Sequence, residues 1–118
     1  MKGELADYSI RFAIRVVNYY KWLTEEKREY VMARQILRSG TSIGANIHES
    51  NFAASRNDFR NKLRIAAKEA SETEYWLIVL EKTGFFDKSF SDLKSTLTSI
   101  IKMLTATLNS LDDGNNDT

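Results

Sequence analysis

The chain has no cysteine, no proline and a single histidine among its 118 residues, and only five glycines. The lack of cysteine excludes disulfides, thiolate zinc sites and cysteine nucleophiles, and His48 alone provides little for an imidazole-based metal site. Because proline is absent, long helices meet no interruption, and few glycines offer few of the turns that β-sandwiches and barrels require. These absences favour helices and leave few of the side chains that most hydrolytic enzymes use.

Long apolar segments are also missing. The longest strongly apolar run, residues 75–80, is far too short to span a bilayer, and the start of the chain lacks the apolar core of a secretory signal. We therefore expect a cytoplasmic protein with no membrane partner. Apolar residues make up 42% and charged residues 28% of the chain, which is typical of one soluble globular domain and too apolar for a disordered chain.

Charge is balanced overall but not along the chain. The formal net charge of +1 predicts no global attraction to nucleic acid or membranes. Residues 1–70 carry 13 basic and 8 acidic side chains, whereas residues 71–118 carry 4 basic and 8 acidic ones. The two parts of the chain therefore have opposite signs.

Apolar side chains recur at steps of three and four in four segments, the spacing of one helical face. These segments cover about residues 4–23, the stretch from Ala33 to Ile47, the stretch from Ser55 to Thr83–Gly84, and the stretch from Ser89 to Leu111. Short connections make sequential helices antiparallel. We predict an all-α fold, an antiparallel up-down-up-down four-helix bundle over residues 1–111, followed by a disordered acidic tail over residues 112–118 that has nothing to bury.

The third segment has the strongest pattern. It begins at a predicted N-cap, Ser55, and ends at Thr83–Gly84, after which Phe85 and Phe86 are expected to fold back over the end of the bundle. Its predicted core positions follow alternating steps of four and three: Phe59, Leu63, Ala66, Ala70, Thr73, Leu77 and Leu80.

Two glycines interrupt the second segment without changing its period. Ile36, Gly40, Ile43 and Ile47 continue one heptad seam, which predicts a helix that runs through Gly40 and Gly44. Each glycine costs about 0.5–1 kcal/mol relative to alanine inside a helix, so a close approach by a neighbouring helix is the expected compensation. The alternative is a helix break near Ser39–Thr41.

Basic side chains repeat at intervals of four in the third segment, at Arg56, Arg60, Arg64 and Lys68, a set here called the basic line. Arg34 and Arg38 have the same spacing in the second segment. Like charges at this spacing repel each other in a helix, so an anionic partner is expected to offset the repulsion. Three interpretations stay open: contacts with the phosphates of a nucleic acid, contacts with acidic residues of a neighbouring subunit, or a solvated helix face.

Carboxylates crowd one stretch of the third segment, at Glu69, Glu72 and Glu74. Such a group can ligate a metal, but the di-iron bundle pattern needs a Glu-x-x-His motif on each of two helices, and here His48–Glu49 stands alone. No phosphate-binding glycine loop, Ser-His-Asp set or H-E-x-x-H motif is present. We therefore expect no catalytic residues, no cofactor, no metal and no small-molecule substrate: the chain is not predicted to be an enzyme.

Two stretches carry a family resemblance, Arg38–Glu49 and the spaced motif from Ser55 to Leu77. They resemble the four-helix-bundle proteins encoded by intervening sequences within bacterial 23S rRNA genes, and the likeness extends from about Tyr8 to Leu111, with Ser50 where the family usually has alanine. The resemblance implies an up-down-up-down bundle that assembles into a ring, typically a homopentamer. The related accessory proteins of diversity-generating retroelements share this bundle and work with a reverse transcriptase and RNA through a basic surface.

The resemblance gives the polar residues of these stretches a structural interpretation. Asn46, Glu49, Glu69 and Glu72 fall within the motifs, beside small residues that permit close packing, and are expected to form a hydrogen-bonded cluster that fixes helix register or the subunit boundary. The expected function is a non-enzymatic oligomeric scaffold that binds RNA or a nucleic-acid-processing enzyme. Its contacts would come from six basic residues: Arg34, Arg38, Arg56, Arg60, Arg64 and Lys68. The alternative is a protein-protein interaction adaptor that binds no nucleic acid.

Overall fold

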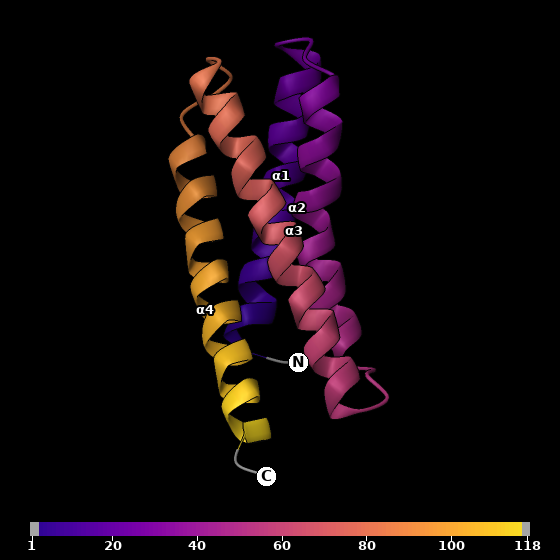
Figure 1. The fold of residues 1–118 in the computed structure, drawn as a ribbon. Helices are drawn as coiled ribbons and strands as arrows, with labels where there is room; N and C mark the ends of the chain where they lie inside the picture. The colour runs from indigo at the N-terminus through magenta and orange to yellow at the C-terminus, as the bar shows by residue number, and fades with distance from the viewer. Residues whose placement is uncertain (1–2, 117–118) are drawn as a thin grey trace.

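Four antiparallel α-helices make up the fold. The structure, a computed structural model, describes residues 3–116. Its helices are α1 (Glu4–Glu25), α2 (Val31–Ser50), α3 (Arg56–Lys82) and α4 (Phe90–Asn116). Each helix packs against two others, α1 and α3 both lying between α2 and α4. The α1–α2 and α3–α4 connections lie at one end, and the α2–α3 connection lies at the other end near both chain ends (Figure 1). The predicted up-down-up-down bundle is confirmed.

The core comes from the apolar stripes that predicted the helices. Along α3, six of the seven predicted core positions are buried, and Phe59 is half-buried against the core. Along α4 the side chains of Leu93, Leu97, Ile100 and Leu104 are buried, whereas Leu108 and Leu111 are only partly covered. The bundle is therefore sealed through most of its length and opens toward the end that holds the C-terminus.

Helix α2 runs without a break through both of its glycines. A Cβ on Gly40 would lie 3.0 Å from both methyl groups of Val16 on α1, and a Cβ on Gly44 would lie 3.3 Å from the Ser9 hydroxyl. These separations are tighter than ordinary side-chain contacts, so the missing side chains let α1 and α2 approach closely. The predicted close approach is confirmed, and the alternative of a helix break at Ser39–Thr41 is wrong.

The ends of α3 have the capping residues that the sequence predicted. The Ser55 hydroxyl accepts a hydrogen bond from the Asp58 backbone N–H at 3.1 Å, and the Asp58 carboxylate accepts one from the Ala54 N–H at 2.9 Å. After α3, Gly84 has a φ of +87°, a conformation that favours glycine. The chain then reverses into α4.

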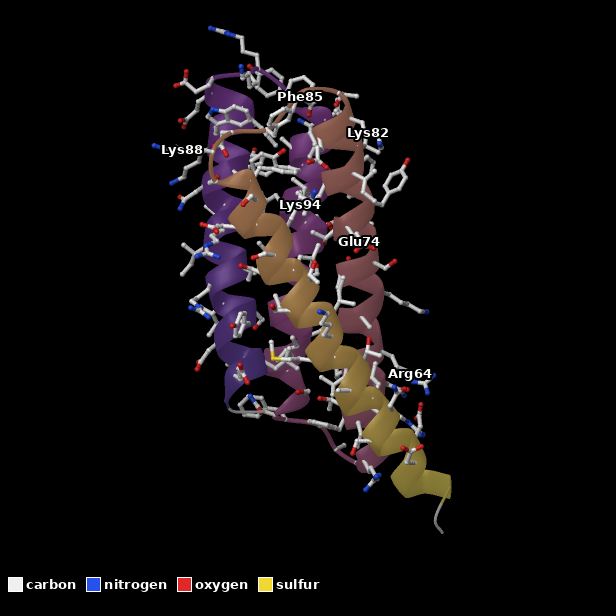
Figure 2. The ribbon with its side chains drawn as sticks, turned by 90° about the vertical axis from the view of Figure 1, so that its left-hand side faces the viewer. Arg64, Glu74, Lys82, Phe85, Lys88 and Lys94 are labelled. Atoms are coloured by element: carbon white, nitrogen blue, oxygen red, sulfur yellow. The ribbon has the colours of Figure 1, made fainter. Side chains whose placement is uncertain are left out.

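Phe85 follows that turn and packs on the core at the end of the bundle, where Figure 2 labels it. Its carbonyl oxygen accepts a hydrogen bond of 2.6 Å from the buried Tyr19 hydroxyl of α1, which ties the α3–α4 connection to the first helix. Phe86 does not share this role, because its side chain is largely exposed. The predicted fold-back therefore applies to Phe85 alone.

Helix α4 extends past Leu111, the predicted end of the bundle, and continues to Asn116. The segment predicted as a disordered tail is thus helical over its described residues 112–116, while residues 117–118 lie outside the described part of the chain. The prediction failed because it looked for apolar side chains to bury, whereas Asp112 is held by ion pairs to α3. Within residues 3–116, no helix combines the length and apolarity needed to cross a bilayer.

Candidate nucleic-acid interface

The basic line follows the side of α3 that faces α4. Its members recur at every fourth position, so consecutive side chains are about 6 Å apart along the helix axis. Arg56 donates a hydrogen bond to the Leu111 carbonyl oxygen at 3.3 Å, which places the start of the line against the end of α4. Lys68, at the other end of the line, is exposed.

Asp112 of α4 bridges the two middle arginines of the basic line. Its Oδ1 atom lies 3.2 Å from Arg60 Nη1 and 3.2 Å from Arg64 Nη2, and its Oδ2 atom lies 3.3 Å from the same Arg64 nitrogen. The Asp112 side chain is 41% exposed, so water reaches the cluster. A carboxylate shared by two guanidinium groups relieves their mutual repulsion, and here that carboxylate comes from the same chain.

Arg38 belongs to α2 and contacts Glu69 and Glu72 on the side of α3 that faces α2. Its guanidinium donates to Glu69 Oε2 at 3.2 Å and to Glu72 Oε2, and the Trp76 indole N–H donates to the same Glu72 oxygen at 3.0 Å. The hydrogen bond from Arg38, followed by the one from Trp76, lowers the pKa of Glu72, and the hydrogen bond to Glu72 raises the pKa of Arg38. Arg38 is therefore engaged at the α2–α3 seam.

The six predicted RNA-binding residues do not form one patch. Arg56, Arg60 and Arg64 contact α4, Arg38 contacts the opposite side of α3, and Arg34 is exposed on α2. The sequence shows the charge spacing on each helix, but not which sides of two helices face the same way. The structure brings together Arg60 and Arg64, which share Asp112, and Arg56, which contacts the neighbouring Leu111 carbonyl oxygen.

The four residues of the predicted polar cluster are also separated. Asn46 donates to the Ser42 carbonyl oxygen one turn earlier at 2.8 Å, and Glu49 accepts from Lys62 of α3 at 3.1 Å. Only Glu69 and Glu72 share a partner, Arg38. The three glutamates each join α2 to α3 through an ion pair, but they do not hydrogen-bond to one another or to Asn46 among the contacts of the described residues.

A buried polar contact between the same two helices escaped the sequence analysis. The hydroxyl oxygens of Ser39 and Thr73 are hydrogen-bonded 2.9 Å apart, and Thr73 also donates to the Glu69 carbonyl oxygen at 2.7 Å. Both side chains are completely buried. A threonine within an otherwise apolar heptad seam was the available signal, because such a residue needs a buried partner.

The described residues provide no preformed metal site or deep cavity for a ligand. No group of three or more histidine, aspartate or glutamate side chains is placed to hold a metal ion within residues 3–116. A small groove of about 120 Å³ lies between α3 and α4, with Leu77, Ile78 and Leu97 along it and Glu74 and Lys94 among its polar neighbours (Figure 2). A larger hollow of about 500 Å³ lies beside the start of α1, lined by Glu4, Tyr8 and Arg11 among others, but it is open to solvent.

Large apolar side chains are exposed on α1, α2 and α3 and in the connections between helices. Ile10 and Ile14, one turn apart on α1, are 58% and 57% exposed, and Tyr75 and Ile78 of α3 are exposed to a similar degree. Phe52, in the α2–α3 connection, is 80% exposed. These side chains leave apolar surface in contact with water in the single chain.

Comparison with known proteins agrees with the fold and the motifs. The chain is similar, at 50% identity and a TM-score of 0.86, to a crystal structure of a protein with unknown function from the S23 ribosomal protein family of Bacteroides thetaiotaomicron VPI-5482; the match covers 89% of this chain and 98% of that one. No curated protein matches the chain. The family model described as 23S rRNA-intervening sequence protein matches residues 2–106, nearly the whole chain. The chain therefore belongs to the 23S rRNA-intervening sequence protein family.

Proposed function

We propose that this chain is a non-enzymatic, self-associating scaffold that binds structured RNA through the basic line of α3. The observation that carries the proposal is the row of four cations, each one turn from the next along α3, of which Arg56, Arg60 and Arg64 contact the end of α4. Arginine suits this role because its planar guanidinium binds phosphate with two parallel hydrogen bonds.

Ion pairs within the chain engage most of the glutamates that a neighbouring subunit could offer to the basic line. The candidates on a neighbouring copy are Glu69, Glu72, Glu74 and Glu81. Glu69 and Glu72 are paired with Arg38 of their own chain, and Glu81 with Lys94. A copy that docked through these three would have to break existing pairs, whereas the exposed Glu74 has no ion pair among the described residues, so the adaptor function is tested below.

Self-association is supported by the apolar side chains that the single chain leaves in water. Ile10 and Ile14 of α1 and Tyr75 and Ile78 of α3 belong to different helices, so one copy can present two apolar faces. Two such faces allow a closed ring in which each copy contacts two neighbours. The ring implied by the family resemblance, typically a homopentamer, is the assembly that we propose.

The test reverses two charges of the basic line and compares them with two charges elsewhere. Arg56→Glu with Arg64→Glu is compared with Lys21→Glu with Lys82→Glu, which changes the net charge equally at exposed sites on α1 and at the end of α3. Binding of a fluorescein-labelled RNA hairpin is measured by anisotropy at low salt, and mass by sedimentation. We expect the first variant to weaken RNA binding about tenfold or more relative to the second, with the oligomer intact.

The other outcomes separate the two functions. If the Arg56→Glu and Arg64→Glu variant dissociates the oligomer and the wild-type chain binds no RNA, the protein-protein adaptor is the correct function. If both variants weaken RNA binding equally, the basic line is not the binding site. Circular dichroism of both variants verifies that the helices are retained.

A further inference from the structure

The end of α4 occupies the surface that the proposed function assigns to RNA. Asp112 places one carboxylate between Arg60 and Arg64, and the Leu111 carbonyl oxygen accepts the hydrogen bond from Arg56. Three of the four cations in the basic line are thus engaged by two consecutive residues of α4. Figure 2 shows Arg64 on α3 close to the last turns of α4.

The contacts of Asp112 with Arg60 and Arg64 resemble those that a phosphate group would make with the same two guanidinium groups. A phosphodiester presents two anionic oxygens to guanidinium groups, and Asp112 presents two oxygens, one of which lies within 3.2 Å of both arginines. Because aspartate is short and lies on a formed helix, its charge stays beside the arginines even if the side chain changes rotamer. A phosphate that approached Arg60 or Arg64 would therefore meet a like charge.

We propose that Asp112 is an internal phosphate mimic that weakens RNA binding until the end of α4 separates from α3. This inference rests on the proposed function, because it requires the basic line to be the RNA-binding surface. RNA and the end of α4 compete for the same guanidinium groups. The chain thereby carries its own autoinhibitory contact.

Several features of the last turns of α4 make their separation from α3 easy. Two acidic residues, Asp112 and Asp113, lie near the C-terminus of the helix, where negative charge opposes the helix dipole, and the last turn has no basic residue. Gly114 follows them and weakens the helix further. Leu111 is only partly buried, so its departure exposes less apolar surface than the loss of a core leucine. Contacts from Arg56, Arg60 and Arg64 join this segment to α3, together with the partly buried Leu111.

Asp113 provides a matched control for the test. It is the next residue on the same helix, it is exposed, and no ion pair is recorded for it among the described residues. Asp112→Asn and Asp113→Asn each remove one negative charge, so both change the long-range attraction of RNA equally. Only Asp112→Asn removes the carboxylate that Arg60 and Arg64 share.

We expect Asp112→Asn to tighten binding of the labelled RNA hairpin by about threefold to thirtyfold, and Asp113→Asn to change it much less. Two arginines that become free to contact phosphates also steepen the dependence of the logarithm of affinity on the logarithm of salt concentration by about 1.5. The protein used is the full chain, and its mass is measured in parallel to exclude a change of assembly.

The outcomes distinguish this inference from the function on which it rests. If Asp112→Asn and Asp113→Asn tighten binding equally, the effect is general electrostatics; the mimic is then wrong, and RNA binding by the basic line stands. If neither the wild-type chain nor Asp112→Asn binds RNA at low salt, the proposed function fails and the inference falls with it. If only Asp112→Asn binds measurably, both are supported.

Discussion

The side chain of Val16 on α1 fills the space that a Cβ on Gly40 of α2 would need. Both methyl groups of Val16 lie 3.0 Å from that position, and Val16 is completely buried. The contact explains why a helix accepts a residue that lowers its intrinsic stability. It also shows how closely α1 and α2 pack at this point.

Gly40→Ala is expected to lower the free energy of unfolding by up to about 2 kcal/mol, even though alanine is the better helix former. The strain of an extra methyl group in a filled site costs about 1–3 kcal/mol, and the gain in helix propensity offsets about 1 kcal/mol of this. Adding Val16→Ala makes room for the new methyl group. The double variant should therefore lose less stability in urea denaturation than the sum of the two single losses.

Gly44→Ala is the control for this prediction, because its Cβ would meet the Ser9 side chain at 3.3 Å and not two methyl groups at 3.0 Å. Its loss of stability should be smaller than that of Gly40→Ala. A Gly40→Ala variant as stable as the wild type would show that α1 and α2 can separate at no cost, contrary to the packing described above.

The hydrogen bond between the hydroxyls of Ser39 and Thr73 gives a second prediction, the order of stability of three variants that lack one or both hydroxyls. Thr73→Val leaves the buried Ser39 hydroxyl without its partner, which costs about 1–3 kcal/mol, whereas Ser39→Ala leaves Thr73 bonded to the Glu69 carbonyl oxygen. Removal of both hydroxyls leaves neither side chain unsatisfied. In thermal unfolding, Thr73→Val should therefore be the least stable of the three variants, below the Ser39→Ala and Thr73→Val double variant. Additive losses in the double variant would contradict this account.

The sequence predicted the helices well because their signal is local. Steps of three and four residues define the buried side of each helix, and Ser55 and Gly84 mark the ends of α3 by their own backbone chemistry. The sites depended on something that is not local, the rotation of each helix about its axis and the register between antiparallel neighbours. Arg38 and Arg64 belong to similar charge patterns, yet Arg38 of α2 contacts glutamates of α3, whereas Arg64 of α3 contacts an aspartate of α4.

Asp112 also shows that local sequence does not reveal contacts between distant residues. In the sequence it begins a run of aspartate, glycine and asparagine, a composition typical of disorder. Its ion-pair partners lie 48 and 52 residues away on α3. Local composition contains no information about such partners, so the extension of α4 was visible only after the fold had brought the two helix ends together.

Tyr19 gives a prediction for alkaline pH. Burial, followed by the nearby carboxylates of Asp87 and Glu29, raises the pKa of its phenol well above the ordinary value of 10.0. The native state therefore keeps the proton while the unfolded chain releases it, so this contribution to stability is complete below pH 10.0 and is lost as the pH rises above it. Tyr19→Phe should lose stability less steeply than the wild type in this range.

At neutral pH the same variant should be less stable by about 0.5–1.5 kcal/mol, because the hydrogen bond to the Phe85 carbonyl oxygen is gone. Tyr20→Phe, on the next residue of α1, controls for the loss of a titrating phenol. Parallel pH profiles for the wild type and Tyr19→Phe in chemical denaturation would show that the hydroxyl is not held protonated in the folded state.

Glu72 gives the corresponding prediction for acid. Hydrogen bonds from Arg38 and then from the Trp76 indole lower its pKa below the ordinary 4.5, so its contribution to stability is present above that pH and is lost as the pH falls through the folded-state value. Because both partners are partly exposed, Glu72→Gln should cost less than about 1 kcal/mol at neutral pH and low salt.

The cost of Glu72→Gln should disappear in acid, where the wild-type carboxyl is protonated too, and should shrink in high salt. Glu74→Gln, an exposed glutamate two residues away, removes the same charge without breaking an ion pair of the described residues, so at neutral pH it should lower the thermal midpoint less than Glu72→Gln does. A difference between wild type and Glu72→Gln that persists unchanged into strong acid would mean that the glutamate stabilises α3 by packing. The junction of α2 and α3 at Arg38 would then depend on shape and not on charge.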